Sequence, residues 1–525
     1  MLLSALVLLT LSLDACGSSY PSVGHRETLH IVNKMVSPDG FQRSAVLVQG
    51  VLPAPMIKGT KGDNFRLNVV NQLTDDSMER GTSIHWHGLL QRGSSWADGA
   101  AGVTQCPIAQ NHSFEYAFNT GNQAGTFWYH SHFGTQYCDG LRGPLVVYDP
   151  HDPYKYMYDE STIITLGEWY HLPSPSVGII AVADSTLING KGRYIGGPLV
   201  DLSVVHIEYG RRYRFRLISV SCSPNFMFSI DSHELTVIEA DGESTLPARV
   251  GSIQMFSGQR YSFVLHANKK VDNYWIRALP SSGHNGLSTG YANATNSAIL
   301  RYKGASLTHP TTPPVAPSNL LRERDLHPLV NPQAPGHPWP GGADVHINLN
   351  LSLGPTGFAV NGKSFSEPPI PVLLQMLSGA RTAKELLPAG AVYTLPRHKV
   401  VELSIPGGLI GGPHPFHLHG HSFSVIQGAG MDALPNYVNP VRRDVVSIGD
   451  AGSNVTIRFK TDNPGPWIFH CHIDFHLKEG LAIVFAEDPA NAGSSVHPVA
   501  WDELCPIYNA LPPSSTSIHL VPSST

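Results

Sequence analysis

Residues 455–476 read VTIRFKTDNPGPWIFHCHIDFH and contain two predicted β-strands separated by a turn. In the first strand Val455, Ile457 and Phe459 alternate with polar residues, a period of two that is typical of a strand with one buried face. The second strand is mostly apolar and ends at His470. The same pair of strands occurs twice earlier in the chain, so it indicates how the whole sequence is organised.

The recurrence is regular. HSFEYAF, QRYSFVL and SNVTIRF overlay with Phe114, Tyr261 and Val455 in register, at offsets of 147 and 194 residues. The strands that follow, TFWYH, NYWIR and PWIFH, give offsets of 147 and 193. Matching offsets in separate segments predict an all-β protein with three consecutive Greek-key β-sandwich or barrel domains.

The overlay also predicts the domain boundaries. The segment before the third copy is rich in proline, as in HPTTPPVAP and NPQAPGHPWPGG, a composition expected of an extended loop. The predicted parts are a first domain at 21–150, a second domain without a metal site of its own at 151–305, a linker at 306–360, a third domain at 361–510 and a Ser/Pro-rich tail at 511–525.

Composition limits the partners and the cellular location. The chain has 35 basic and 40 acidic residues, a formal net charge of −5, and therefore lacks the basic excess that nucleic-acid binding needs. Residues 1–13, MLLSALVLLTLSL, are too few to span a bilayer and predict a signal peptide within residues 1–20. Cys16 weakly resembles a bacterial lipid-attachment site. No later apolar run is long enough to span a membrane.

Four H-x-H pairs supply the candidate metal ligands. They are His85/His87, His130/His132, His417/His419 and His470/His472. On a strand, residues i and i+2 point to the same face, so each pair can present two imidazoles to a metal ion. A single zinc ion takes four ligands at most. Eight imidazoles divide as three, three and two, which predicts three metal ions with open coordination positions.

The second copy of the repeat has lost these ligands. In the overlay His130 falls on Arg277 and His85 falls near Asp231, and only His233 remains of the nearby histidines. Copies one and three therefore contribute two pairs each. We expect a metal cluster at the interface between the first and third domains.

Cys471 predicts a second kind of site. It lies between His470 and His472, so on a strand its sulfur points to the opposite face from their rings. With His414 and His476 it makes one thiolate and two imidazoles, the trigonal ligand set of a blue-copper centre. The alternative is a buried structural cysteine.

Spacing places Leu481 at the weak axial position of this centre. An aliphatic side chain donates nothing to copper, so we expect a higher potential than that of a site with an axial Met. Four coppers can store four electrons, and the reduction of O₂ to two waters consumes four. The residues therefore predict an oxidase that reduces O₂ to water.

The chain contains the motifs HWHGLL, GTFWYHSH, QYCDGLRGPLVVYDP, HPFHLHGHSF and HCHIDFHLKEGLAIVFAE. On these motifs the sequence resembles the fungal laccases of the multicopper oxidase family, from about Thr28 to Tyr508. It implies three cupredoxin-like domains and four copper ions. The implied ligands are His414, Cys471 and His476 for type 1 copper, His85 and His417 for type 2, and His87, His130, His472 with His132, His419, His470 for the two type 3 ions.

The resemblance also implies a disulfide framework. Four non-ligand cysteines allow three pairings. The family selects Cys106 with Cys505 and Cys138 with Cys222.

Carboxylates near the cluster should orient histidines and help deliver protons. The resemblance assigns this role to Asp98, in WADG, with Asp444 and Asp474 as weaker candidates. Ser223 stands where many fungal laccases carry an acid that accepts a hydrogen bond from the phenol. A hydroxyl can hold a phenol but accepts its proton poorly, so we expect phenols to be oxidised less efficiently than donors that lose no proton. The ring edge of His476 is the expected electron entry point.

These features predict a secreted, monomeric laccase that oxidises phenols and aromatic amines and reduces O₂, with a role in lignin degradation among those possible. A second hypothesis keeps the coppers but assigns Fe(II), ascorbate or a bilin pigment as donor. A third is a copper-binding protein without turnover, which loss of a ligand would favour, but none is missing. The N-x-Ser/Thr sequons that fit secretion begin at Asn111, Asn293, Asn350 and Asn454.

Overall fold

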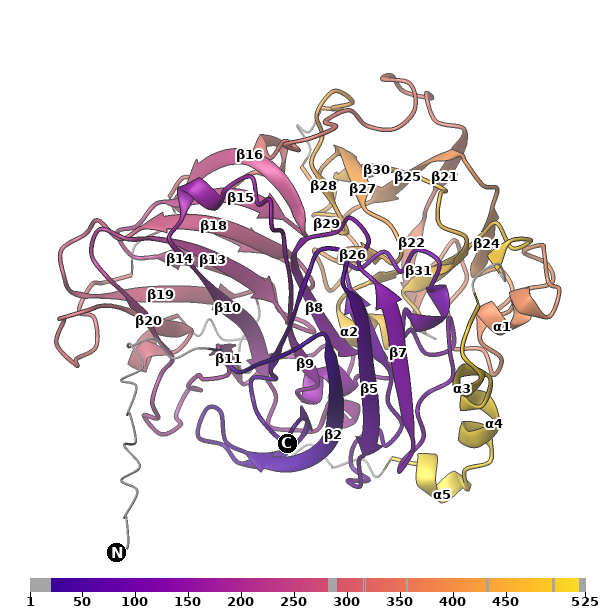
Figure 1. The fold of residues 1–525 in the computed structure, drawn as a ribbon, viewed down its shortest axis with the longest axis horizontal. Helices are drawn as coiled ribbons and strands as arrows, with labels where there is room; N and C mark the ends of the chain where they lie inside the picture. The colour runs from indigo at the N-terminus through magenta and orange to yellow at the C-terminus, as the bar shows by residue number, and fades with distance from the viewer. Residues whose placement is uncertain are drawn as a thin grey trace, which may run out of the picture.

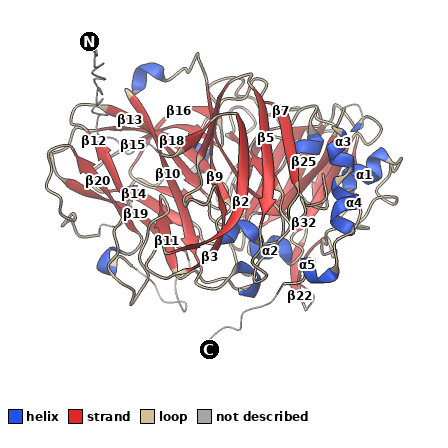
Figure 2. Cartoon of the chain, turned by 60° about the horizontal axis from the view of Figure 1, so that its bottom comes forward, coloured by secondary structure: helices blue, strands red, loops and turns tan. Residues whose placement is uncertain are grey.

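The structure, a computed structural model, describes residues 20–281, 290–314, 316, 318–355, 357–430, 434–492 and 496–518. Strands dominate these ranges, and the longest helices, α1 (Val372–Leu377) and α4 (Leu504–Asn509), have six residues each. Figure 2 shows the helices as short pieces around the strands. No described helix is long and apolar enough to cross a membrane. The predicted signal peptide, including Cys16, lies outside the described residues except for Tyr20.

The first unit is a sandwich of two sheets. Its strands are β1 (Ser22–Val23), β2 (Arg26–Val36), β3 (Arg43–Val48), β4 (Met56–Thr60), β5 (Asn64–Gln72), β6 (Ile84–His87), β7 (Ser113–Asn119), β8 (Gly125–Ser131) and β9 (Arg142–Tyr148). The sheets have the orders β3-β2-β5-β7 and β1-β4-β9-β8-β6.

The second unit repeats this plan. Its strands are β10 (Glu160–Trp169), β11 (Ser185–Ile188), β12 (Val204–Ile207), β13 (Arg212–Ser219), β14 (Phe226–Ile230), β15 (Leu235–Ala240), β16 (Glu243–Val250), β17 (Ile253–Met255), β18 (Arg260–His266), β19 (Asn273–Pro280) and β20 (Ser297–Tyr302). The sheets have the orders β11-β10-β13-β18-β15-β16 and β12-β20-β19-β14-β17.

The third unit adds several short helices to the same plan. Its strands are β21 (Val345–Asn348), β22 (Leu351–Gly354), β23 (Gly357–Val360), β24 (Val392–Leu395), β25 (Val400–Pro406), β26 (Pro415–Leu418), β27 (Phe423–Gln427), β28 (Arg442–Arg443), β29 (Val445–Ser447), β30 (Asn454–Lys460), β31 (Gly465–Cys471) and β32 (Ala482–Glu487). The sheets are β21-β25-β30-β27-β28, β24-β32-β31-β26-β29 and the hairpin β22-β23. Besides α1 and α4, the helices are α2 (Asp474–Lys478), α3 (Val499–Asp502) and α5 (Pro513–Thr516), of which α5 lies in the predicted tail.

The pairing of the strands confirms the threefold repeat. The sets β2-β5-β7, β10-β13-β18 and β21-β25-β30 each begin with a parallel pair and continue with an antiparallel pair. The next strand in each copy, β8, β19 or β31, belongs to the opposite sheet. Figure 1 shows the second unit at the left, the third at the right, and the first below and between them.

One part of the predicted linker is wrong. Residues 345–360 form β21, β22 and β23, and β21 pairs in parallel with β25 in the main sheet of the third unit. The physical reason is the alternation of Val345 and Ile347 with polar residues, which supplies the strand that corresponds to β2 and β10. The Pro-rich stretch before it contains only the short 3₁₀ helix Glu323–Asp325 among its described elements.

The units share their hydrophobic cores. One buried cluster joins Phe215 and Phe263 of the second unit to Phe416 and Phe469 of the third. Another joins the core of the first unit to residues of the third, among them Ile468. Shared cores fix the units relative to one another, so side chains from different units can be held in one site.

Candidate metal centres

The four H-x-H pairs meet in the interior, at the junction of the first and third units. His85 and His87 lie on β6, and His85 is directly opposite His130 of β8. In the third unit His417 of β26 is directly opposite His470 of β31 in the same way. All eight histidines of the pairs are buried. Cross-strand pairing within each unit and a shared core between the units therefore bring the predicted cluster together.

The facing ring nitrogens of this histidine cluster are close. His87 Nδ1 lies 3.2 Å from His472 Nε2, and His419 Nε2 lies 3.2 Å from His470 Nε2. Ligating atoms lie within 4.8 Å of one another in the groups His85/His87/His417, His87/His130/His472 and His132/His419/His470.

The outer ring nitrogens are held by oxygen atoms, as is usual for histidines that ligate metals. Five of these contacts are His85 Nδ1 to Asp98 O at 2.8 Å, His417 Nδ1 to Asp444 O at 2.8 Å, His130 Nδ1 to Ser131 O at 2.8 Å, His470 Nδ1 to Cys471 O at 2.9 Å and His419 Nδ1 to Asp98 Oδ2 at 2.8 Å. Two more are His87 Nε2 to Asp444 Oδ1 at 3.2 Å and His472 Nδ1 to Tyr137 OH at 3.1 Å. Each contact leaves the other ring nitrogen for a metal ion.

The ring nitrogens of the histidine cluster are suited to bind metal ions. His130 Nε2 and His132 Nε2 are buried and have no hydrogen-bond partner, which is costly unless a metal ion takes that place. Burial, reinforced by the neighbouring His85, lowers the pKa of His132 and of His472 to about 3. These imidazoles are therefore neutral at ordinary pH, which is the form that binds metals.

The sulfur site lies on the other side of β31. Cys471 Sγ is 3.4 Å from His414 Nδ1 and 3.7 Å from His476 Nδ1, and the two nitrogens are 3.0 Å apart. All three side chains are buried, and Cys471 is the free cysteine of the described chain. Burial raises the pKa of the Cys471 thiol, so its thiolate needs a cation beside it. Leu481 is fully buried, and its carbonyl accepts the Cys471 N–H at 3.0 Å.

Two of the three candidate carboxylates lie at the histidine cluster, and the third lies elsewhere. Asp98 is fully buried and contacts His85 and His419, and Asp444 contacts His87 and His417. Asp474 instead lies beside Cys222, a cysteine of the predicted Cys138–Cys222 disulfide, and its backbone N–H donates to Cys222 O at 2.9 Å.

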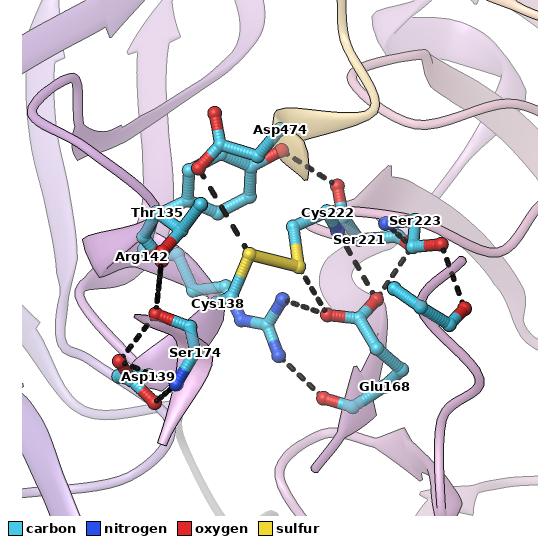
Figure 3. The surroundings of a disulfide bond; sticks show 12 residues. Thr135, Cys138, Asp139, Arg142, Glu168, Ser174, Ser221, Cys222, Ser223 and Asp474 are labelled. Atoms are coloured by element: carbon cyan, nitrogen blue, oxygen red, sulfur yellow. Dashed lines mark hydrogen bonds and ion pairs between the residues drawn. A yellow bond between two sulfur atoms is a disulfide. The ribbon is translucent and has the colours of Figure 1, made fainter. Parts of the chain in front are cut away.

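Both disulfides implied by the resemblance are present. Cys106 bonds to Cys505, and Cys138 bonds to Cys222. Figure 3 shows Asp474 and Glu168 on either side of the second disulfide, with Ser223 next to Cys222.

The segment that carries Ser223 packs against the start of α2. Ser223 is half-buried, and its Oγ donates to Ala181 O at 3.4 Å. Because Cys222 O accepts from Asp474 N, the segment that carries Ser223 lies against the helix that carries His476.

Some features of the site were outside the reach of the sequence. The contact of Tyr137 with His472 joins residues 335 positions apart, and no spacing rule indicates it, although Tyr137 lies inside the QYCDG motif. The second unit differs at the positions that overlay on the ligands. Arg277 binds Asp231 through two contacts of 2.8 and 2.9 Å, so a buried ion pair occupies the positions that overlay on the ligands.

A thiolate with two imidazoles beside a buried cluster of eight imidazoles, on three β-sandwiches, defines a copper redox protein. Sequence profiles of multicopper oxidases match residues 30–152, 160–305 and 365–491. The chain is 57% identical to Laccase-2 of Pleurotus ostreatus over 96% of its own length and 97% of that protein's. It is 54% identical to a laccase of Phlebia radiata over 97% of its own length and 98% of that protein's.

Solved structures agree. The laccase from Botrytis aclada superposes with a TM-score of 0.81 at 32% identity and 94% coverage of both chains. Fet3p, described as a multicopper oxidase that functions in iron import, superposes with a TM-score of 0.78 at 26% identity, covering 95% of this chain and 97% of that one. The chain belongs to the multicopper oxidase family, as a laccase-type enzyme. The predicted fold class and enzyme class are thereby confirmed, and copper is the metal that the family binds.

Proposed function

We propose that the enzyme holds four copper ions. Type 1 copper is assigned to His414, Cys471 and His476, and type 2 copper to His85 and His417. The two type 3 ions are assigned to His87, His130, His472 and to His132, His419, His470. The observation that carries the proposal is that the ligating atoms of each type 1 or type 3 set lie within 4.8 Å, and that the type 2 pair lies in one such group with His87.

Copper bound in these sites would supply one-electron oxidation of a donor at the sulfur site and reduction of O₂ to two waters at the histidine cluster. The chain's own residues connect the two sites. Cys471 lies between His470 and His472, so a covalent backbone path joins the sulfur ligand to two imidazoles of the cluster. His470 Nδ1 also bonds to Cys471 O at 2.9 Å, which shortens the path.

The proposed donors are phenols and aromatic amines. The proposal is supported by the high identity of the chain to laccases over nearly its whole length. The proposed role of Ser223 is to hold the donor, since its hydroxyl can donate or accept a hydrogen bond without taking up the proton. The expected result is slower oxidation of phenols than of donors that release no proton.

Asp98 is the proposed carboxylate of the oxygen site. Its Oδ2 accepts the His419 Nδ1–H, and its backbone carbonyl accepts the His85 Nδ1–H. These bonds select the tautomers that leave Nε2 of both rings free for copper. The other oxygen of the Asp98 carboxylate, Oδ1, is buried and has no hydrogen-bond partner, so it can accept a hydrogen bond from reduced oxygen.

The enzyme is further proposed to be secreted and monomeric, with three domains near the predicted boundaries. Two disulfides support an oxidising compartment. The sequon residues Asn111, Asn293, Asn350 and Asn454 are exposed, which is compatible with glycan attachment.

Visible absorption, metal analysis and oxygen uptake on a phenol test the proposal together. The expected result is intense blue colour, four coppers per chain and one O₂ for every four one-electron oxidations. The variant Cys471→Ser should lose the colour and the turnover. Colourless copper-loaded enzyme, or full turnover in this variant, would overturn the proposal.

A further inference from the structure

The second unit supplies no proposed copper ligand, yet its backbone touches the histidine cluster. The turn between β17 and β18 contains Gly258, whose φ is +85°. A Cβ at this position would lie 2.9 Å from His472 Cδ2 and 3.1 Å from His87 Cε1. Only glycine allows the chain to come this close in this conformation. The second unit therefore forms one wall of the cluster.

The same turn leads into Arg260, which joins all three units. Arg260 is fully buried. Its Nη1 and Nη2 donate to Asp444 Oδ1 at 2.6 Å and Oδ2 at 2.7 Å in the third unit. Its Nε donates to Thr126 O of the first unit at 3.2 Å, and Nη1 also donates to Gly258 O at 3.1 Å. A two-point contact of this kind fixes the plane of the carboxylate as well as its position.

Asp444 passes this orientation to two imidazoles. Its Oδ1 lies 3.2 Å from His87 Nε2, and its backbone carbonyl accepts the His417 Nδ1–H at 2.8 Å. The other nitrogens of these two rings face the cluster, where His417 Nε2 lies 3.5 Å from His85 Nε2. Asp98 holds His85 and His419 from the first unit in the corresponding way.

We propose that the second unit positions the copper ligands from outside, through Arg260 and Gly258. Arg260 is a positioning residue: it holds Asp444, which orients His87 and His417. Gly258 seats the turn against His87 and His472 and closes that side of the cluster. The inference rests on the proposed copper site. The second unit, which supplies no proposed copper ligand, thereby helps to build the copper site of the first and third units.

The test uses Arg260→Lys with Arg277→Lys as its matched control. Lysine keeps the charge and loses the two-point contact. Arg277 makes the same kind of two-point bond to Asp231, and both residues belong to the second unit, which supplies no proposed copper ligand. Copper-free full-length protein is titrated with Cu(II) against a competing chelator, and the electron paramagnetic resonance spectrum of type 2 copper is recorded. The unfolding temperature of each copper-free variant is measured in parallel.

Arg260→Lys should weaken copper binding at the histidine cluster by about 10- to 100-fold and alter the type 2 spectrum, while the blue colour remains. Arg277→Lys should lower the unfolding temperature and leave copper binding unchanged. Equal copper binding in the two variants, or equal losses in both, would overturn the inference. If the wild type itself bound no copper at the cluster, the proposed function would fail instead.

A second pair of variants decides the matter if Arg260→Lys does not fold. Gly258→Ala is compared with Gly210→Ala, which has nearly the same φ, +86°, and has no atom within 4 Å of the added Cβ. Both variants carry the same backbone strain, but only the first pushes the rings of His87 and His472. Weakened copper binding in Gly258→Ala alone supports the inference, and unchanged binding overturns it.

Discussion

Asp98 Oδ2 accepts a hydrogen bond from His419 Nδ1 at 2.8 Å, across the boundary between the first and third units. Asp98 follows a 3₁₀ turn of the first unit, and His419 follows β26 of the third. One fully buried carboxylate thus fixes the orientation of a ring that belongs to the other half of the cluster.

Removing the Asp98 carboxylate should weaken copper binding at the histidine cluster more than it lowers the stability of the fold. Asp98→Ala is expected to lose about 10- to 100-fold in copper affinity at the cluster, because the side chain no longer fixes the orientation of the His419 ring. Asp98→Asn should lose less, since an amide oxygen still accepts one hydrogen bond. Copper titration with visible spectra checks this. The prediction fails if both variants keep wild-type affinity, or if the blue colour disappears as well.

Restoring an acid at position 223 should favour phenols. In Ser223→Asp the new carboxylate can take the phenol proton, and general-base assistance is typically worth about 10²–10⁴-fold. We expect kcat/KM to rise at least about tenfold for a phenol above the pKa of the new acid. It should change little for a donor that releases no proton. Ser223→Asn is the matched control, and equal changes for both donors would contradict the prediction.

The residue at the axial position should set the potential of the sulfur site. Leu481→Met replaces a non-ligand by a thioether of similar volume, so the fold should lose less than about 1.5 kcal/mol. The added ligand stabilises Cu(II), and we expect the potential to fall. A fall of about 59 mV lowers the equilibrium constant for one-electron oxidation of a donor tenfold. Redox titration followed at the blue band measures it. An unchanged or higher potential would show that Leu481 does not occupy this position.

Glu79 should make the stability depend on pH. Burial, assisted by Asp139, raises the pKa of Glu79 from 4.5 to about 7. The folded state therefore binds a proton that the unfolded state releases between these two values. Stability should fall as pH rises through this window, by about 3 kcal/mol in total, and remain lower above it.

Glu79→Gln should remove the Glu79 share of this dependence and stabilise the protein above pH 7. The neutral amide avoids the cost of a buried carboxylate charge whose Oε2 has no hydrogen-bond partner. Urea unfolding of both proteins from pH 4.5 to 8 checks the slope. Parallel curves for the two proteins would mean that another group is responsible.

The repeat and the ligand pairs could be predicted from the sequence because both are local patterns. Alternation over a few residues marks strands such as 455–460, and an H-x-H pair on a strand puts two rings on one face. The offset between copies then showed that the second unit had lost its ligands. The strand at Val345–Asn348 was not predicted, because the linker predicted from the proline-rich stretch continued to residue 360 and included it.

The partners of the ligands could not be predicted in this way. Tyr137 of the first unit reaches His472 of the third, and Arg260 of the second unit reaches Asp444 of the third, only after the units have docked. Their sequence separations from the ligands carry no periodic signal. Tertiary packing alone decides which polar group faces each ring.

The Cys106–Cys505 bond closes a ring of covalent chain whose ends are 399 residues apart in sequence. Every proposed ligand except His85 and His87 lies inside that ring, and those two lie in the segment before Cys106, which carries strands β1 to β6. A single proteolytic cut in the Pro-rich stretch would open the ring and release nothing. Both fragments would stay tethered by one sulfur–sulfur bond, so nicked enzyme would keep all of its ligands until a reductant arrives.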